Sequence, residues 1–215
     1  MDFVLSDVET RVLGSLIEKS MTTPDYYPLS LVALTAACNQ KSNRDPLVNF
    51  DETTVVRGLD SLKEKRLAVQ SDASRVPKYA ETFVNRYNLL GREAAIMMVL
   101  LLRGAQTVGE IRTRTERAHQ FDDIADVEVA LDEMIEAGYV IKLPRQIGRK
   151  EPRYAHLLSG EPNLDEVMAA RPEVATLSVR VENDRVDALS SEVERLRGEL
   201  DQLRAEFDRF KHQFE

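Results

Sequence analysis

The chain has 215 residues, of which 43% are hydrophobic and 31% are charged, and its formal net charge is −8. This length allows one large or two small domains, and the scarcity of glycine and proline favours helices over a turn-rich β-sandwich or barrel. The one cysteine excludes an internal disulfide and is typical of a reducing compartment. The N-terminus lacks a signal-peptide pattern, and the apolar run at 94–102 is too short to span a bilayer. We therefore expect a cytoplasmic protein without a membrane segment.

The negative charge is concentrated at the C-terminal end of the chain. Residues 1–90 carry 11 basic and 12 acidic side chains, and residues 91–160 carry 10 and 11, so each region has a net charge of −1. Residues 161–215 carry 8 basic and 14 acidic side chains, a net charge of −6. This distribution argues against strong non-specific affinity for nucleic acid, but it leaves room for local basic patches.

Residues 1–90 have the pattern of three helices followed by two strands. Apolar residues recur at helical spacing in "SDVETRVLGSLIEKS", "LSLVALTAACN" and "FDETTVVRGLDSLKEKR". The expected N-caps of these helices are Ser6 or Asp7, Ser30 and Asp51. Val55, Leu59 and Leu62 fall on one face of the third helix. "RLAVQS" is then expected to form a strand, "DASRVPKYA" a hairpin tip, and "ETFVNRYNLL" the returning strand.

Residues 91–160 repeat this order. "GREAAIMMVLLLRG", "TVGEIRTRTERAH" and "DVEVALDEMIEAG" predict three helices, with Thr107 as the cap of the second, and "YVIKL" and "RYAHLL" predict two strands around the loop "PRQIGRKEP". An offset of 72 superposes the third helices and the strands that follow them: Val55 on Val127, Leu59 on Leu131, Leu62 on Met134, Leu67 on Tyr139 and Val69 on Ile141. An internal repeat of three helices and a hairpin is the pattern of a winged helix-turn-helix.

Residues 176–215 have a different pattern, with apolar residues at nearly unbroken 3-4 spacing. The expected oligomerisation residues are Val186, Leu189, Val193, Leu196, Leu200, Leu203, Phe207 and Phe210. A single helix would expose this stripe to water, so it either pairs with a second copy or folds back on its own chain. The strict heptad spacing favours self-association as a homodimer through a coiled coil.

The expected fold is therefore mainly α with small β-hairpins (α+β). It comprises winged helix-turn-helix domains at 1–90 and 91–160, a linker at 161–175 and a C-terminal coiled-coil helix at 176–215.

Three stretches resemble a known family: "ACNQKSNRDP", "LLRGAQTVGEIRTRTERAHQF" and "LPRQIGRKEPRYAHLL". They are similar to the YceH-like family of bacterial proteins, which is known mainly as uncharacterised, and the similarity runs over most of residues 3–158. The resemblance implies a tandem winged-helix fold and no particular activity.

The stretch "AACNQKSNRDPL" joins the second and third helices of the first repeat, and it has two interpretations. In the structural one, the amides of Asn39, Gln40 and Asn43 cap the end of the second helix and replace missing backbone partners in a long turn. In the functional one, the same amides and Arg44 line a surface that contacts base edges or a peptide. We favour the structural interpretation. Cys38 has no histidine nearby in sequence, so we expect a small buried hydrophobe rather than a nucleophile.

The second hairpin is the better candidate for contacts with phosphates, because five cations fall within 12 residues. A solvated, charged hairpin is the alternative. The candidate nucleic-acid-binding residues are Asn43, Arg44, Arg57, Lys63, Lys65, Arg66, Arg112, Arg114, Lys142, Arg145, Arg149, Lys150 and Arg153. The third helix of the second repeat is acidic and would be repelled by a major groove, whereas that of the first repeat is mixed in charge. The helix of the first repeat and the hairpin of the second are therefore the favoured elements.

Enzyme chemistry has little support, and no catalytic residue, cofactor or metal is expected. His119, His156 and His212 are isolated, no paired-ligand metal spacing occurs, and there is no Gly-rich phosphate loop. The expected function is that of a DNA-associated, dimeric transcriptional regulator. The alternative is a protein-interaction scaffold that uses its winged-helix surfaces and its coiled coil. The partners considered are DNA, a second copy of the chain and another protein.

Overall fold

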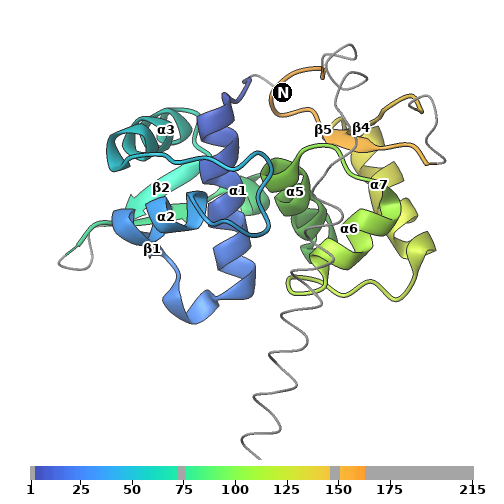
Figure 1. Cartoon of the computed structure of the whole chain (residues 1–215), viewed down its shortest axis with the longest axis horizontal. Coiled ribbons are helices and arrows are strands. Elements are labelled where there is room, and N and C mark those ends of the chain that lie inside the picture. The colour runs from blue at the N-terminus through green and yellow to red at the C-terminus, as the bar shows by residue number, and fades with distance from the viewer. Residues whose placement is uncertain (1–2, 72–75, 146–150, 163–215) are drawn as a thin grey trace, which may run out of the picture. The chain divides into compact units, whose positions relative to one another are not determined.

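The computed structural model describes residues 3–71, 76–145 and 151–162 (Figure 1). The described residues all belong to one compact unit, which spans residues 1–168. The linker at 161–175 (beyond residue 162), the coiled coil at 176–215, and the cations Arg149 and Lys150 lie outside the described residues, so the predictions made for them remain predictions.

The first repeat contains the expected three helices and a small sheet. Its elements are α1 (Asp7–Thr22), the short 3-10 helix η1 (Pro24–Tyr26), β1 (Leu29–Ser30), α2 (Leu31–Cys38), α3 (Glu52–Glu64), β2 (Ala68–Ser71), β3 (Lys78–Glu81) and α4 (Phe83–Arg86). The predicted caps are confirmed, because the side chains of Ser6, Ser30 and Asp51 accept hydrogen bonds from backbone N–H groups one turn ahead.

The second repeat follows the same order. Its elements are α5 (Gly91–Arg103), α6 (Val108–Thr115), α7 (Ile124–Glu136), β4 (Val140–Lys142) and β5 (Tyr154–His156). Thr107 caps α6, as the sequence predicts, and Glu110 completes a capping box with it. The three predicted helices of each repeat and the two predicted strands of the second repeat are confirmed for the described residues.

The strand predicted over "ETFVNRYNLL" is wrong. The returning strand is β3, which ends at Glu81, and a short helix, α4, follows it. The carboxylate of Glu81 accepts the backbone N–H of Val84 at 2.9 Å, and this bond favours a helical turn. Buried Phe83 meets Tyr87, four residues later, with the ring centroids 5.0 Å apart.

The two sheets are small and antiparallel. In the first, β3 lies between β1 and β2, with Tyr79 opposite both Leu29 and Gln70. In the second, β4 pairs with β5, with Val140 opposite His156. The described chain is thus an α+β protein with seven α-helices and two small sheets.

The core is continuous between the repeats, because α1 and α5 lie side by side at its centre (Figure 1). The helices approach closely at Gly14, where an added Cβ would lie 3.0 Å from the Cβ of Leu101 and the Cδ2 of Leu102. The N–H of Leu5 also donates to the carbonyl of Leu158 at 2.8 Å. The predicted boundary near residue 90 falls between α4 and α5, and the division into two domains stays a prediction.

Candidate nucleic-acid interface

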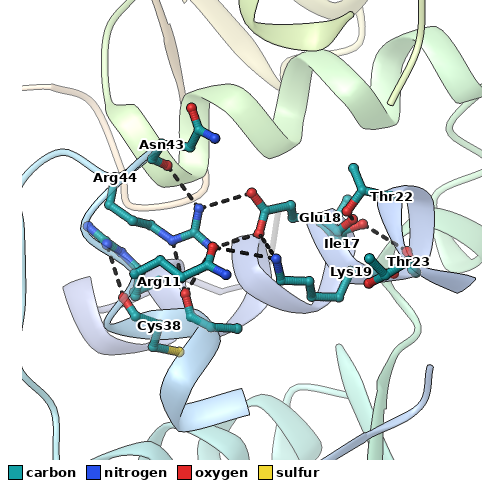
Figure 2. A network of polar contacts seen from close by, with 12 residues as sticks. Arg11, Ile17, Glu18, Lys19, Thr22, Thr23, Cys38, Asn43 and Arg44 are labelled. Carbon is teal, nitrogen blue, oxygen red and sulfur yellow. Dashed lines mark hydrogen bonds and ion pairs between the residues drawn. The ribbon is translucent and has the colours of Figure 1, made fainter. Parts of the chain in front are cut away.

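Arg44 lies inside the joint between α2 and α3 and has a buried side chain. Its Nη1 donates to Oε1 of Glu18 at 3.0 Å and its Nη2 to Oε2 at 2.7 Å, so the pair is bidentate (Figure 2). Its Nε and Nη2 also donate to the carbonyl of Ala37 in α2, at 3.1 and 2.8 Å. The guanidinium therefore ties the joint to α1 and α2, and its burial removes Arg44 from the side chains that a ligand can reach.

The cations around Glu18 stabilise its charged form, whereas the two buried arginines, Arg11 and Arg44, repel each other. Burial alone would raise the pKa of the Glu18 carboxyl, but the hydrogen bonds and charge of Arg44, helped by Lys19, outweigh burial and hold the pKa below its ordinary value. Arg11 is also buried, and it donates to the carbonyls of Cys38 and Pro46. Burial lowers the pKa of Arg11, and the nearby charge of Arg44 lowers it further. The site holds two buried arginines because carbonyl oxygens and one carboxylate accept hydrogen bonds from their N–H groups.

Two other predictions about the joint are confirmed. Cys38 is a buried thiol whose pKa is raised mainly by burial, which is the opposite of what a nucleophile needs. The amide of Asn39 makes a reciprocal pair with Phe50, donating to its carbonyl and accepting its N–H, both at 2.8 Å. This pair closes the loop, as expected of an amide that replaces missing backbone partners.

Asn43 and Gln40 also serve the joint. The backbone of Asn43 has a φ of +57°, a region that asparagine tolerates better than most residues, and its Oδ1 accepts from Arg103 at 2.9 Å. The side-chain oxygen of Gln40 accepts from both Arg44 and Lys19. The structure thus agrees with the structural interpretation of this stretch.

The outward face of α3 is exposed to solvent. Val55, Leu59 and Leu62 are buried on its inner face, as predicted. Thr53 and Arg57 are exposed on the opposite face. This face presents a cation and a hydroxyl to solvent, two groups that contact phosphates and bases.

The other cations at the end of α3 are engaged to different degrees. Lys63 pairs with Asp60 at 2.8 Å, and Lys65 pairs with Glu9 of α1. Arg66 is exposed with a φ of +59°, and its carbonyl accepts from Arg86. Lys65 therefore fixes the end of α3 against α1, whereas Arg66 faces solvent.

The hairpin of the second repeat presents Lys142 and Arg145 to solvent. The Nζ of Lys142 lies 5.6 Å from the ring centroid of Tyr154, within the range of a cation–π contact. Arg153 turns inward, where it donates to the carbonyl of Ala105 at 2.6 Å and to Glu110 at 3.3 Å. Arg153 therefore packs the hairpin against the start of α6.

The predicted cations of α6 are held locally. The Nη2 of exposed Arg112 donates to the carbonyl of Asp122 at 3.0 Å. Arg114 is 3.9 Å from Glu110, one turn earlier on the same helix, and its side chain is mostly covered. These contacts stabilise α6 and the loop after it.

The outward face of α7 is acidic, as the sequence indicates. Val129 is half-exposed on this face, and exposed carboxylates lie along α7 and just before it. They belong to Asp122, Asp123, Asp126, Glu128, Asp132, Glu133 and Glu136. By the offset of 72, Val129 occupies the position that Arg57 has on α3. The two equivalent helices therefore differ at this position, although both expose acidic residues, Asp60 and Glu64 on α3 and Asp132 and Glu136 on α7.

Arg11 and Glu18 were not anticipated from sequence, although a signal for them exists. Arg11, Ser15 and Glu18 recur at helical spacing and form a buried polar stripe on α1. Apolar residues flank that stripe on both sides, a pattern that indicates buried polar groups with partners elsewhere in the fold.

The described residues contain no group of three or more His, Cys, Asp or Glu side chains that could hold a metal ion. The ring of His119 lies edge-on against Phe121, with the centroids 4.7 Å apart. Burial lowers the pKa of His156 to about 4, so this ring is neutral near pH 7. In the same part of the chain, no helix is long and apolar enough to cross a membrane.

Comparison with known proteins identifies relatives over most of the chain. A family model described as "Protein of unknown function, DUF480" matches residues 5–149. A UPF0502 protein of Geobacter sulfurreducens is 54% identical over 196 residues, which cover 89% of this chain and 90% of the relative. UPF0502 proteins of Geotalea daltonii and Solibacter usitatus are 54% and 53% identical, over 89% of this chain and over 89% and 92% of their own lengths. The chain therefore belongs to the DUF480 family and is a relative of the bacterial UPF0502 proteins.

Proposed function

We propose that the protein is a cytoplasmic, DNA-associated regulator of transcription built from two winged helix-turn-helix units. The resemblance to the YceH-like family and the repeated order of three helices and a hairpin support this proposal. In it, residues 176–215 pair two copies of the chain as a coiled coil. The outward face of α3 and the exposed part of the second hairpin contact nucleic acid, and the acidic α7 does not.

The observation that carries the proposal is the solvent-exposed outer face of α3. In a helix-turn-helix unit the third helix presents its outward residues to the major groove. Here Thr53 and Arg57 hold those positions, and the packing of the inner face on the core fixes their direction. An arginine in the groove donates to guanine, and a hydroxyl contacts several bases.

Lys142 and Arg145 supply the second contact. Exposed cations on a hairpin meet phosphates, which adds affinity without choosing a sequence. Because only a few exposed cations are involved and the whole chain is acidic, we expect weak binding with a shallow salt dependence, since the slope grows by about one unit for each phosphate contact.

The test is binding of the full-length protein to short genomic DNA duplexes at about 0.1 M salt and over a salt series. R57A is expected to weaken binding by about 1–3 kcal/mol at preferred sequences. K142A together with R145A should weaken binding to all duplexes and lower the salt slope by up to about 2.

The matched control is R92Q, which removes one positive charge from α5, outside the proposed surface. We expect DNA affinity to be unchanged in this variant. Absence of salt-dependent binding by the wild-type protein, or equal losses in R57A and R92Q, would refute the proposal.

A protein-interaction scaffold is the second candidate, and the outward face of α7 favours it. This face combines Val129 with exposed carboxylates along α7, which is suited to a cationic partner segment rather than to DNA. Affinity capture from nuclease-treated cells, with wild type and V129R compared, separates the two candidates. A defined protein retained by wild type and lost from V129R would favour the scaffold.

A further inference from the structure

The C-terminal end of α5, in the second repeat, contacts residues 43–45 of the joint that precedes α3. The N–H of Asp45 donates to the carbonyl of Leu102 at 2.9 Å. Two residues earlier along the joint, the Oδ1 of Asn43 accepts from the Nη2 of Arg103 at 2.9 Å. Both contacts join groups more than fifty residues apart in sequence, and both lie in the last turn of α5.

The residues that make these two contacts, Asn43 and Asp45, flank Arg44, whose side chain is directed towards α1 and α2 instead. Arg44 is held beneath the joint by Glu18 and by the carbonyl of Ala37, so its position is set within the first repeat (Figure 2). Asn43 and Asp45, on either side of it, are held by the second repeat. The joint is therefore fixed from both repeats at three consecutive residues.

The same joint sets the start of α3. The Asn39–Phe50 pair closes the loop, and the next residue, Asp51, is the N-cap of α3. Residues 46–50 link the joint at 43–45 to Asp51, and hydrogen bonds from Arg11 to the carbonyl of Pro46 and between Asn39 and Phe50 hold the two ends of this link. The first turn of α3 holds Thr53, and Arg57 follows one turn later.

From these contacts we infer that Leu102 and Arg103 at the end of α5 position α3, so that the second repeat controls the placement of the helix that faces nucleic acid. The positional effect stands on the contacts themselves; its consequence for DNA affinity rests on the proposed function. Anything that shifts the end of α5 thereby alters the exposed face of α3. Arg103 and Asn43 are positioning residues, because they act through the joint.

The experiment is hydrogen–deuterium exchange of the full-length protein, read at the backbone amides of residues 43–57. R103A removes the side-chain contact from the second repeat. We expect exchange at these amides to accelerate by about fivefold or more, since loss of one well-placed hydrogen bond raises local opening by that order. N43G deletes the same contact from the other side while tolerating the positive φ.

Three comparisons make the result specific. R92A removes another arginine from α5 whose partner, Glu133, lies in the second repeat, so exchange at 43–57 should stay at the wild-type rate. N43D keeps an acceptor oxygen for Arg103, so it should restore wild-type exchange. In the N43G background, R103A should accelerate exchange less than it does in the wild-type background, because the contact between the two side chains is already lost.

Wild-type exchange at 43–57 in R103A, or equal acceleration in R103A and R92A, would overturn the inference. If the proposed function holds, R103A also lowers DNA affinity by about fivefold or more without touching the proposed surface. Accelerated exchange together with no DNA binding by the wild-type protein would refute the proposed function and leave the positioning role in place.

Discussion

Arg44 and Glu18 form a bidentate ion pair in the interior, with nitrogen–oxygen distances of 3.0 and 2.7 Å, although 26 residues separate them in sequence. Breaking a buried pair by removing one partner leaves a charge that cannot reach water. E18Q and R44A are each expected to lower the free energy of unfolding by about 3–5 kcal/mol, measured by urea denaturation. The exposed pair of Arg92 and Glu133 is the control, and E133Q should cost less than about 1 kcal/mol.

The double variant E18L/R44M sharpens this prediction. An apolar pair of similar size removes both charges at once, so it should recover most of the stability lost in either single variant. A double variant as unstable as the sum of the singles would show that the hydrogen bonds to Ala37, rather than the ion pair, carry the effect.

His156 makes the protein less stable in mild acid. Burial lowers its pKa in the folded state to about 4, against an ordinary value of 6.5, so the unfolded chain binds a proton first as the pH falls. Stability is unaffected above the ordinary pKa and declines as the pH falls from about 6.5 towards 4. Between pH 7.5 and pH 5 the loss attributable to this ring is about 2 kcal/mol.

Urea denaturation at these two pH values measures the loss. H156L should remove most of the pH dependence in this window, and H119L should keep it. The lowered pKa of Glu18 acts on the same side but at lower pH, because its contribution is lost only below its ordinary value of 4.5. An unchanged pH slope in H156L would contradict the assignment.

Gly14 permits the close approach of α1 to α5. Because a Cβ there would lie 3.0 Å from side-chain atoms of Leu101 and Leu102, G14V should force the helices apart and lower the free energy of unfolding by about 1–3 kcal/mol. Thermal denaturation measures the change. Gly109 in α6 is the matched control, since nothing lies within 4 Å of its added Cβ, and G109A should be neutral or stabilising by up to about 1 kcal/mol.

The heptad pattern of the tail predicts the mass of the protein in solution. We expect light scattering to give the mass of a dimer, and L196D/L203D to give that of a monomer, because charges at core positions of a coiled coil oppose pairing. The surface substitution E194Q is the control and should remain dimeric. A monomeric wild-type protein would contradict self-association through residues 176–215.

Much of the fold was predictable because its signals are local. Ser6, Ser30, Asp51 and Thr107 cap helices as expected, since a cap is decided by the next three residues. The two-residue strand β1 was not predicted, because two residues are too few to show an alternating pattern.

The site was less predictable because its partners are distant in sequence. From the sequence alone, Arg44 is a candidate for contacting a ligand. In the structure, α1 packs against the joint and places Glu18 beside Arg44 as its partner. Arg153 was grouped with the exposed cations of its hairpin, but the carbonyl of Ala105 and the carboxylate of Glu110 draw it inward. Residue type and spacing identify charged groups; only tertiary contacts decide which of them are already engaged.

The close packing of α1 against α5 couples the residues that each repeat can accept at this contact. A side chain cannot grow at Gly14 unless Leu101 or Leu102 shrinks, so variation in one half is screened by the other. Either repeat expressed alone would expose the apolar face of α1 or α5 that the other repeat covers, and such a surface promotes aggregation.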